Sequence, residues 1–269
     1  MYDLNICIPT FNRKDKVVGI VKFFLNEFKH RNVCITVQDN ASVDGTYFEL
    51  MDMFSQYENV FIHKNGKNIG LGGNINILYR CNISRYIWVV GDDDDIEAGI
   101  CDYMFKEFES KPNLACFFIN HRALNKDGSV IFPEAYSKSN ADQDKLVSVF
   151  KEKGSVMMFL SSMLYKVDSL QLLLKEKPNF FSGRLTLPLF VSLAMSETFG
   201  SGYMRDSKYI ANIHGDTSWS RGAWKVFVLG VPAELLRLGV LTGKVYPIYL
   251  LFRYLYLRAS NKFKRILGS

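Results

Sequence analysis

Four consecutive aspartates, Asp92–Asp95, are the most distinctive chemical feature of this 269-residue sequence. Neighbouring carboxylates repel one another by on the order of 1–4 kcal/mol per pair, so solvent or a cation must offset the repulsion. Mg²⁺ and Mn²⁺ take carboxylate and phosphate oxygens as ligands, and usually only one or two of these belong to the protein. If the preceding strand continues, Asp92 and Asp94 point to one side, and Asp93 and Asp95 to the other. The run predicts a divalent-metal site, with a solvated, helix-capping loop as the alternative.

Two further groups could bind a nucleotide. The segment Asn68–Asn74 (Asn-Ile-Gly-Leu-Gly-Gly-Asn) precedes a predicted helix. Its glycines allow the backbone to approach a phosphate or ribose closely, and a helix N-terminus favours an anion. The segment matches neither a dinucleotide fingerprint nor a P-loop, so a glycine-rich turn without a ligand remains the alternative. Asp39, at the end of a predicted strand, could accept hydrogen bonds from a base or ribose, or simply close an Asx turn.

The pattern of apolar residues predicts the elements that position these groups. Short apolar runs indicate strands, and apolar residues at helical spacing indicate helices between them. Strands alternating with helices are typical of an α/β fold with a mainly parallel central sheet covered by helices on both faces. The expected strands are Leu4–Ile8, Val33–Val37, Val60–His63, Tyr86–Val90 and Leu114–Ile119, and the expected helices are Lys16–Phe28, Thr46–Tyr57, one ending near Arg80, and Ile96–Phe108.

Polar residues follow the first four predicted strands directly. In a parallel sheet, ligands bind at the carboxyl ends of the strands, so these four loops should converge on one edge. The loops are Pro9-Thr10-Phe11-Asn12-Arg13, Asp39–Asp44, Asn65–Asn74 and Asp92–Asp95.

The second half of the chain is less regular. A strand is expected at Met157–Leu164, helices at Val167–Lys175 and Leu187–Ala194, and a last strand at Tyr209–Ile213. Three residues after this strand carry possible functions, each with an ordinary structural alternative. His214 could complete a metal shell or contact a diphosphate, Trp219 could stack on a sugar, and Arg221 could pair with phosphate.

Four segments in the first hundred residues together resemble glycosyltransferase family 2, whose members adopt the GT-A fold. The order and spacing of these segments are more specific than any single motif. The region from Tyr209 to Trp219 is similar to the late strand and loop of bacterial O-antigen and abequosyltransferase-like members. The four segments are Ile6–Arg13, Val37–Thr46, Asn68–Asn74 and Trp88–Asp95.

The resemblance implies a Mn²⁺- or Mg²⁺-dependent transferase with a nucleotide-sugar donor and an inverting displacement. The acceptor would be a glycan or a polyprenyl-diphosphate-linked glycan in bacterial surface polysaccharide synthesis. Asp92 and Asp94 would form the D-x-D pair, with Asp94 rather than Asp92 as the direct metal ligand, and His214, named above, remains a further candidate ligand. Asp95 would contact the donor sugar, together with Trp219 and Arg221. The implied nucleotide-binding residues are Pro9, Thr10, Asn12, Arg13, Asp39 (at the nucleobase), Asn68, Gly70, Asp92 and Asp93.

The general base of the family often lies in a Glu-Asp pair near the start of a helix in the second half of the domain. The corresponding segment here, Ser182–Thr186, contains no acid. The nearest acids, Glu197 and Asp206, are therefore the candidate bases.

The C-terminal residues carry the positive charge of the chain. The formal charge is +6, and residues 225–269 contain eight basic residues against one acid, Glu234. We expect a transferase domain at 1–222 and a basic, apolar, helical tail at 223–269. This composition predicts contact with an anionic membrane surface, with packing on the domain or on a second copy of the chain as the alternative. A nucleic-acid partner is not expected.

The cysteines and the N-terminus bear on the compartment. The five cysteines are odd in number and form no C-x-x-C pair, so we expect buried free thiols in a reducing compartment. The first residues lack the pattern of a signal peptide, and no apolar run reaches the roughly 20 residues of a membrane span. The expected location is cytoplasmic, peripheral at the inner face of the plasma membrane.

Two other functions compete with transfer. A sugar nucleotidyltransferase also uses aspartates on a metal, but it normally has a glycine-rich loop after its first strand, where this chain has Thr10–Lys14. A non-catalytic scaffold with the same fold would explain the missing Glu-Asp pair.

Overall fold

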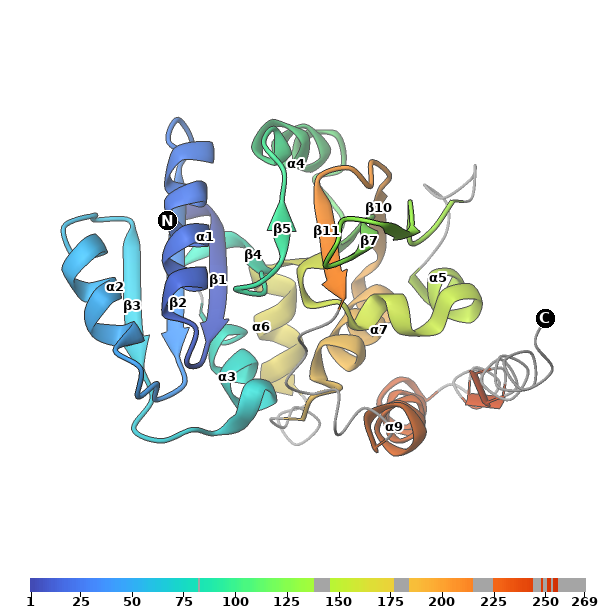
Figure 1. Ribbon diagram of the computed structural model, residues 1–269. Helices are drawn as coiled ribbons and strands as arrows, with labels where there is room; N and C mark the ends of the chain where they lie inside the picture. Colours follow the sequence, from blue (N-terminus) through green and yellow to red (C-terminus); the bar gives the residue numbers. More distant parts are fainter. Residues whose placement is uncertain are drawn as a thin grey trace.

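A seven-stranded sheet runs through the computed structural model, which describes residues 1–81, 83–137, 146–176, 184–214, 225–243, 248, 251–252 and 254–255 (Figure 1). The strand order is β10-β6-β9-β4-β1-β2-β3. In this sheet β9 is antiparallel to both of its neighbours, and the other neighbouring strands pair in parallel. The expected mainly parallel α/β sheet is confirmed. The strands are β1 (Tyr2–Thr10), β2 (Val33–Asp39), β3 (Val60–Lys64), β4 (Ser84–Val89), β6 (Cys116–Ile119), β9 (Met163–Lys166) and β10 (Ser201–Met204).

Helices cover both faces of this sheet because side chains alternate between the faces along each strand. Ile6 and Ile8 of β1 pack in the cluster that contains Phe24 of α1, whereas Cys7 packs in the opposite cluster with α6 and α7. The helices are α1 (Lys14–Glu27), α2 (Thr46–Phe54), α3 (Gly70–Leu78), α4 (Ile100–Ser110), α5 (Leu146–Lys153), α6 (Val167–Glu176), α7 (Leu187–Phe199) and α9 (Val231–Thr242).

A second, four-stranded sheet begins at Asp95, the last of the four aspartates. Its order is β5-β11-β7-β8, and β5 pairs antiparallel with β11. Asp92, Asp93 and Asp94 therefore lie between β4 of the first sheet and β5 of the second, and Asp95 is the first residue of β5. The strands are β5 (Asp95–Ile96), β7 (Arg122–Asn125), β8 (Val130–Phe132) and β11 (Ile210–His214).

Two predicted elements are wrong. The helix expected from Ile96 begins only at Ile100, because Asp95–Ile96 pairs with β11 and Gly99 adopts a left-handed conformation (φ 89°). The strand expected at Met157–Leu164 is two 3₁₀ turns followed by β9, which starts at Met163. Short apolar runs fit a strand or a helix equally well, so periodicity alone could not separate them.

The predicted burial of the cysteines holds for four of the five, and the reducing compartment stays a prediction. All five cysteines are free, and Cys7, Cys34, Cys101 and Cys116 are buried, while Cys81 is partly exposed. Burial raises the pKa of the Cys116 thiol, which leaves it protonated and unreactive.

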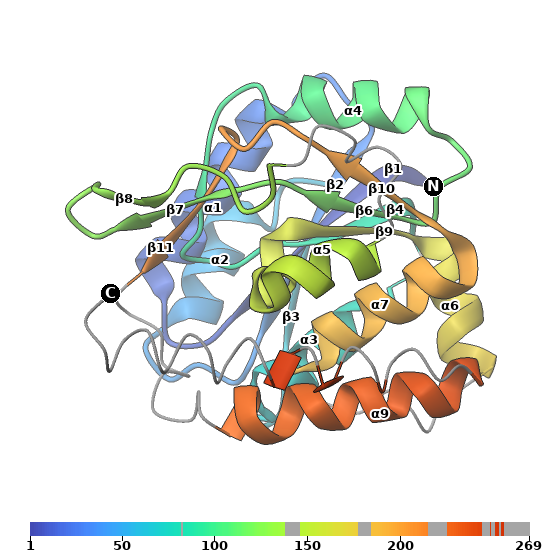
Figure 2. The same cartoon turned by 90° about the vertical axis from the view of Figure 1, so that its right-hand side faces the viewer.

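The described part of the tail packs against the domain. Val231, Leu235 and Leu238 of α9 are buried in the same cluster as α7, and Figure 2 shows α9 running along the outside of α7. The predicted boundary at 222/223 falls in a segment outside the described residues. No helix in the described ranges has the length and apolar character needed to cross a bilayer.

Candidate functional site

The loop after β1 and the turn after β4 meet through Arg13. The Arg13 guanidinium lies 2.8 Å from an oxygen of Asp92 and 2.6 Å from one of Asp93. Thr10 donates a hydrogen bond of 2.7 Å to the other oxygen of Asp92. Parallel pairing of β1 with β4 brings these residues together, since Cys7 lies opposite Val89. Burial raises the pKa of Asp92, and the donors from Thr10 and Arg13 act against that shift.

The strand does not continue through the aspartates, so the alternation expected on that condition does not occur. Strand β4 ends at Val89, and Asp92 and Asp93 lie in a turn rather than in an extended strand. Arg13 therefore binds Asp92 and Asp93 together, although a strand would point them to opposite sides. Asp94 turns the other way, towards Ser161.

Asp94 is held by a residue far along the chain. The hydroxyl of Ser161, in the 3₁₀ turn Leu160–Ser162 before β9, donates to the Asp94 carboxylate. Ser161 in turn accepts a hydrogen bond of 2.9 Å from the Gly91 amide and one of 2.8 Å, at its carbonyl, from the Trp88 indole. A Cβ at Gly91 would lie 2.5 Å from an Asp94 oxygen, so a larger residue there would displace the Asp94 carboxylate. Sequence reasoning had no signal for Ser161, because it lies 67 residues from Asp94.

The charge of Asp94 is not balanced by a cation. Burial and the charges of Asp93 and Asp92 raise its pKa to about 7, although Ser161 acts in the opposite direction. No ion pair to Asp94 is present in the part of the chain that the structure describes, and Asp95 is exposed at the start of β5. A divalent cation would relieve this excess, and carboxylate oxygens are its preferred ligands, so the donor set fits Mn²⁺ or Mg²⁺.

The protein alone does not complete a metal shell within the described ranges. No three His, Cys, Asp or Glu side chains gather there to hold an ion. A shell built from one or two carboxylates and substrate phosphates is what Mg²⁺ commonly adopts, and the turn is suited to such a shell.

Asp39 closes a turn at the end of β2. Its carboxylate is fully buried and accepts hydrogen bonds from the backbone amide and the hydroxyl of Ser42. The Ser42 hydroxyl also accepts from the Asn12 amide at 2.8 Å, and Asn12 adopts a left-handed φ of 53°. This is the geometry of the Asx-turn alternative, and it joins the loops after β1 and β2. A role of Asp39 at a nucleobase stays a prediction.

A network of amide side chains fixes the glycine-rich loop. Asn65 donates to Asn40 and to Asn74, each at 2.9 Å, and Asn40 donates to Asn68 at 3.0 Å. Asn68 accepts the amide of Gly70, whose left-handed φ of 76° starts α3. These hydrogen bonds connect Asn68 and Gly70, two predicted nucleotide-binding residues, to Asn40 after β2 and Asn65 after β3.

The two candidate bases lie in different places. Asp206 follows β10. Its backbone amide donates a hydrogen bond of 3.0 Å to the Tyr103 hydroxyl of α4, and its carboxylate lies 3.4 Å from the Lys208 ammonium. Glu197 lies near the end of α7, which leads into the amino end of β10. Glu197 therefore precedes the amino end of β10, whereas Asp206 follows its carboxyl end.

The late loop is only partly described. His214 ends β11, but its side chain lies outside the described residues, as do Trp219 and Arg221 entirely.

A carboxylate from the tail reaches the start of α7. Glu234 of α9 is 1% exposed and accepts hydrogen bonds from Arg184 (2.7 and 3.1 Å) and from Thr186 (2.6 Å). Arg237 lies 3.5 Å away. The segment before α7 contains no acid of its own, and Glu234, about 50 residues further along the chain, supplies one. Because Glu234 is enclosed by these donors, its role here is to hold α9 on α7.

His121, which follows β6, is a buried neutral group that sequence reasoning missed. Its ring packs 4.6 Å from that of Phe159, and burial lowers its pKa to about 4. Its Nδ1 has no hydrogen-bond partner. No motif marked this residue.

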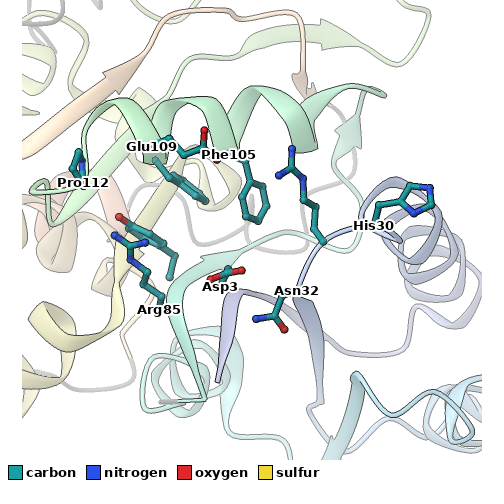
Figure 3. Close-up of a pocket in the computed structure, with 10 residues that line it drawn as sticks. Asp3, His30, Asn32, Arg85, Phe105, Glu109 and Pro112 are labelled. Carbon is teal, nitrogen blue, oxygen red and sulfur yellow. The ribbon is translucent and has the colours of Figure 1, made fainter.

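A surface hollow of about 420 Å³ lies away from the aspartates, where α4 passes the amino ends of β1, β2 and β4. Figure 3 shows Phe105 reaching towards Asp3, with Arg85 and His30 at opposite ends of the hollow. None of the predicted nucleotide-binding residues lines it.

Comparison with known proteins gives a consistent result. The pattern of the family described as "Glycosyl transferase family 2" matches residues 5–170. Abequosyltransferase RfbV of Salmonella typhimurium is 25% identical over 177 residues, which are 61% of this chain and 53% of that protein. The chain therefore spans about half the length of this curated relative.

Solved structures share the fold at low identity. S. aureus TarS 1-349 aligns over 94% of this chain and 70% of its own, with a TM-score of 0.65 and 15% identity. The same fragment in complex with UDP-GlcNAc gives 0.64 and 14%, again over 94% of this chain and 71% of its own. Mannosyltransferase PcManGT from Pyrobaculum calidifontis, in complex with GDP-Man and Mn²⁺, aligns over 98% of this chain and 72% of its own, with a TM-score of 0.61 and 13% identity.

Proposed function

The chain belongs to glycosyltransferase family 2 and has the GT-A fold, and on this premise we propose that it moves a sugar from a nucleotide-sugar donor to a glycan or lipid-linked glycan, using a divalent metal. The observation that carries the proposal is the acidic turn after β4, whose carboxylates exceed the one arginine that binds them. Solved relatives with UDP-GlcNAc and with GDP-Man and Mn²⁺ support this class of donor and cofactor.

The metal would bind at Asp94, with Asp92 and His214 as further candidate ligands. Bound there, Mn²⁺ or Mg²⁺ would neutralise the charge that develops on the β-phosphate as the nucleoside diphosphate leaves. Arg13 holds Asp92 and Asp93 in position for this. Both oxygens of Asp92 already accept hydrogen bonds, which favours Asp94 as the direct ligand.

The donor would lie along the connected loops of the strand ends. Pro9, Thr10, Asn12 and Arg13 follow or end β1, and the amide network presents Asn68 and Gly70 beside them. Asp39 would contact the nucleobase in addition to closing the turn with Ser42. Fixed loops favour binding because little ordering remains to be done when the nucleotide arrives. The proposed contacts to the donor sugar and its phosphates are Asp95, Trp219 and Arg221.

The proposed reaction is an inverting displacement assisted by a carboxylate base. Asp206 follows the carboxyl end of β10, whereas Glu197 precedes its amino end. Ligands of α/β sheets bind at carboxyl ends, which favours Asp206 over Glu197. If Asp206 is the base, Asp206→Asn lowers turnover, while Glu197→Gln leaves it unchanged.

The acceptor and the location follow from the relative and from the tail. The similarity to an abequosyltransferase supports a role in bacterial O-antigen-type polysaccharide synthesis. A polyprenyl-diphosphate-linked acceptor would be held at the inner face of the plasma membrane, so we propose a peripheral cytoplasmic enzyme there. The basic tail supports this location, since each cation near an anionic leaflet contributes about 1 kcal/mol. A second copy of the chain is the other proposed partner.

A nucleotide-sugar panel tests the proposal. Melting temperatures measured with Mn²⁺ should rise for one donor, because a ligand that binds only the folded state stabilises it. With that donor, nucleoside diphosphate should be released, and Asp94→Asn should lose Mn²⁺-dependent donor binding. Asp102→Asn is the matched control, since Asp102 is an exposed aspartate on α4 that pairs with Arg31.

Three outcomes would overturn parts of the proposal. Unchanged donor binding in Asp94→Asn would remove the metal assignment. No release with any donor, with and without a lipid-linked acceptor, would favour a non-catalytic scaffold. Pyrophosphate release from a nucleoside triphosphate and a sugar phosphate would favour a sugar nucleotidyltransferase.

A further inference from the structure

Helix α9 is apolar on two opposite sides. Its inner side, Val231, Leu235 and Leu238, is buried against α7. Its outer side exposes Leu236 (49%) and Val240 (75%), four residues apart and therefore on one stripe. Globular helices normally present polar residues to water on the outer side, so this stripe has no partner in the described structure.

The next tail segment repeats the pattern. Ile248, Phe252 and Leu255 are all exposed, with Phe252 at 67%, and their spacing of four and three residues places them on one side of a helix. Tyr254, which lies between Phe252 and Leu255 in the sequence, is buried, and its hydroxyl donates to the Phe227 carbonyl at 2.8 Å. This contact anchors the segment to the π-helix Val226–Gly230, which precedes α9, while the apolar side chains remain exposed.

The charges beside these stripes are of one sign. The tail has eight basic residues and one acid, and that acid, Glu234, is buried and bound by Arg184 and Thr186. Among the described residues, Lys225 is exposed at the start of the tail, and the Arg237 side chain, within α9, is 41% exposed. With its acid enclosed, the tail combines a strongly positive formal charge in its sequence with exposed apolar side chains in its described part.

We propose that the stripes Leu236/Val240 and Ile248/Phe252/Leu255 form a docking face for an anionic lipid surface, on which the tail lies flat. Apolar side chains flanked by Lys and Arg are what the headgroup boundary of an anionic bilayer accommodates. A second copy of the chain fits less well, because two tails of the same positive charge would repel each other. The inference rests on the proposed function in one respect: if the acceptor is lipid-linked, docking of the tail would bring the enzyme within reach of it.

Vesicle flotation of the full chain tests the docking face. The protein should float with phosphatidylcholine vesicles that contain phosphatidylglycerol, and much less with phosphatidylcholine alone. The triple variant Leu236→Ser/Val240→Ser/Phe252→Ser should bind the anionic vesicles about tenfold or more weakly, because it loses three apolar anchors. Val130→Ser is the matched control, since Val130 is 60% exposed on β8, away from the tail.

Each result decides the inference. Wild-type protein that stays unfloated, or a triple variant that floats like wild type, overturns it. A lipid-free dimer that the triple variant abolishes would assign the face to a second copy and also overturn it. Nucleoside diphosphate release without a lipid acceptor should be equal in wild type and triple variant, so a failure of docking is distinguishable from a failure of the proposed function.

Discussion

Two arginine–carboxylate sites in this protein differ in their balance of charge. In the turn after β4, one arginine, Arg13, binds Asp92 and Asp93, while Asp94 receives a neutral donor, the Ser161 hydroxyl, and no cation from the described residues. Between α7 and α9, the single carboxylate of Glu234 is bound by Arg184 and Thr186 and has Arg237 nearby. The first site has surplus negative charge, and the second has none.

The difference separates a site built for a ligand from one built for stability. Surplus carboxylates cost free energy until a cation arrives, so such a site is poised to bind one. An enclosed carboxylate with matched donors holds two helices together, and removal of one partner leaves a buried charge uncompensated. The four predictions below follow from this contrast, from the largest expected effect to the smallest.

The largest effect is expected on turnover in Asp94→Asn. If Asp94 holds the metal, its loss should lower Mn²⁺-dependent transfer roughly 100- to 1000-fold, which corresponds to about 3–4 kcal/mol of lost transition-state stabilisation. Nucleoside diphosphate release by variant and wild type at saturating donor measures this. Glu234→Gln, assayed below its melting temperature, should retain turnover. Equal losses of turnover in Asp94→Asn and Glu234→Gln would contradict the division into a ligand site and a structural site.

The next effect is expected on stability in Glu234→Gln. Breaking a buried ion pair on one side costs about 3 kcal/mol, which for a domain of this size lowers the melting temperature by roughly 6–12 °C. Thermal unfolding followed by circular dichroism measures this. A variant that melts like wild type would show that Glu234 does not hold α9 on α7.

A smaller effect concerns pH. The folded-state pKa of Asp94, about 7, lies above its ordinary value of 3.8. The folded protein therefore keeps a proton that the unfolded protein releases, and metal-free protein should lose stability as pH rises from about 4 to 7. Asp94→Asn should remove this loss and be more stable than wild type at pH 8 by about 1 kcal/mol or more, after allowance for solvent screening. Melting curves in chelator at pH 5 and pH 8 test this, and identical pH dependence in both proteins would contradict it.

The smallest effect is expected in Arg237→Gln. Its side chain is 41% exposed and lies 3.5 Å from Glu234, so its loss should cost less than about 1 kcal/mol. A cost as large as that of Glu234→Gln in the same melting assay would show that Arg237, rather than Arg184, balances the carboxylate.

Local sequence signals predicted the first half of the fold well. The strands β1 to β4, the helices between them and the position of the acidic turn follow from apolar runs, glycines and polar loops. The prediction failed where a short segment pairs with distant chain, as β5 does with β11, because pairing rather than propensity decides such segments.

The sequence by itself determined the parallel sheet, the family, and the clustering of polar loops at one edge, because strand periodicity and contiguous motifs are local properties. Only the tertiary structure decided that Arg13 binds Asp92 and Asp93 together, that Ser161 holds Asp94, and that Glu234 serves the start of α7. These contacts join residues roughly 50 to 80 positions apart. Their partners are chosen by how the layers pack, and one sequence carries no local pattern that records that choice.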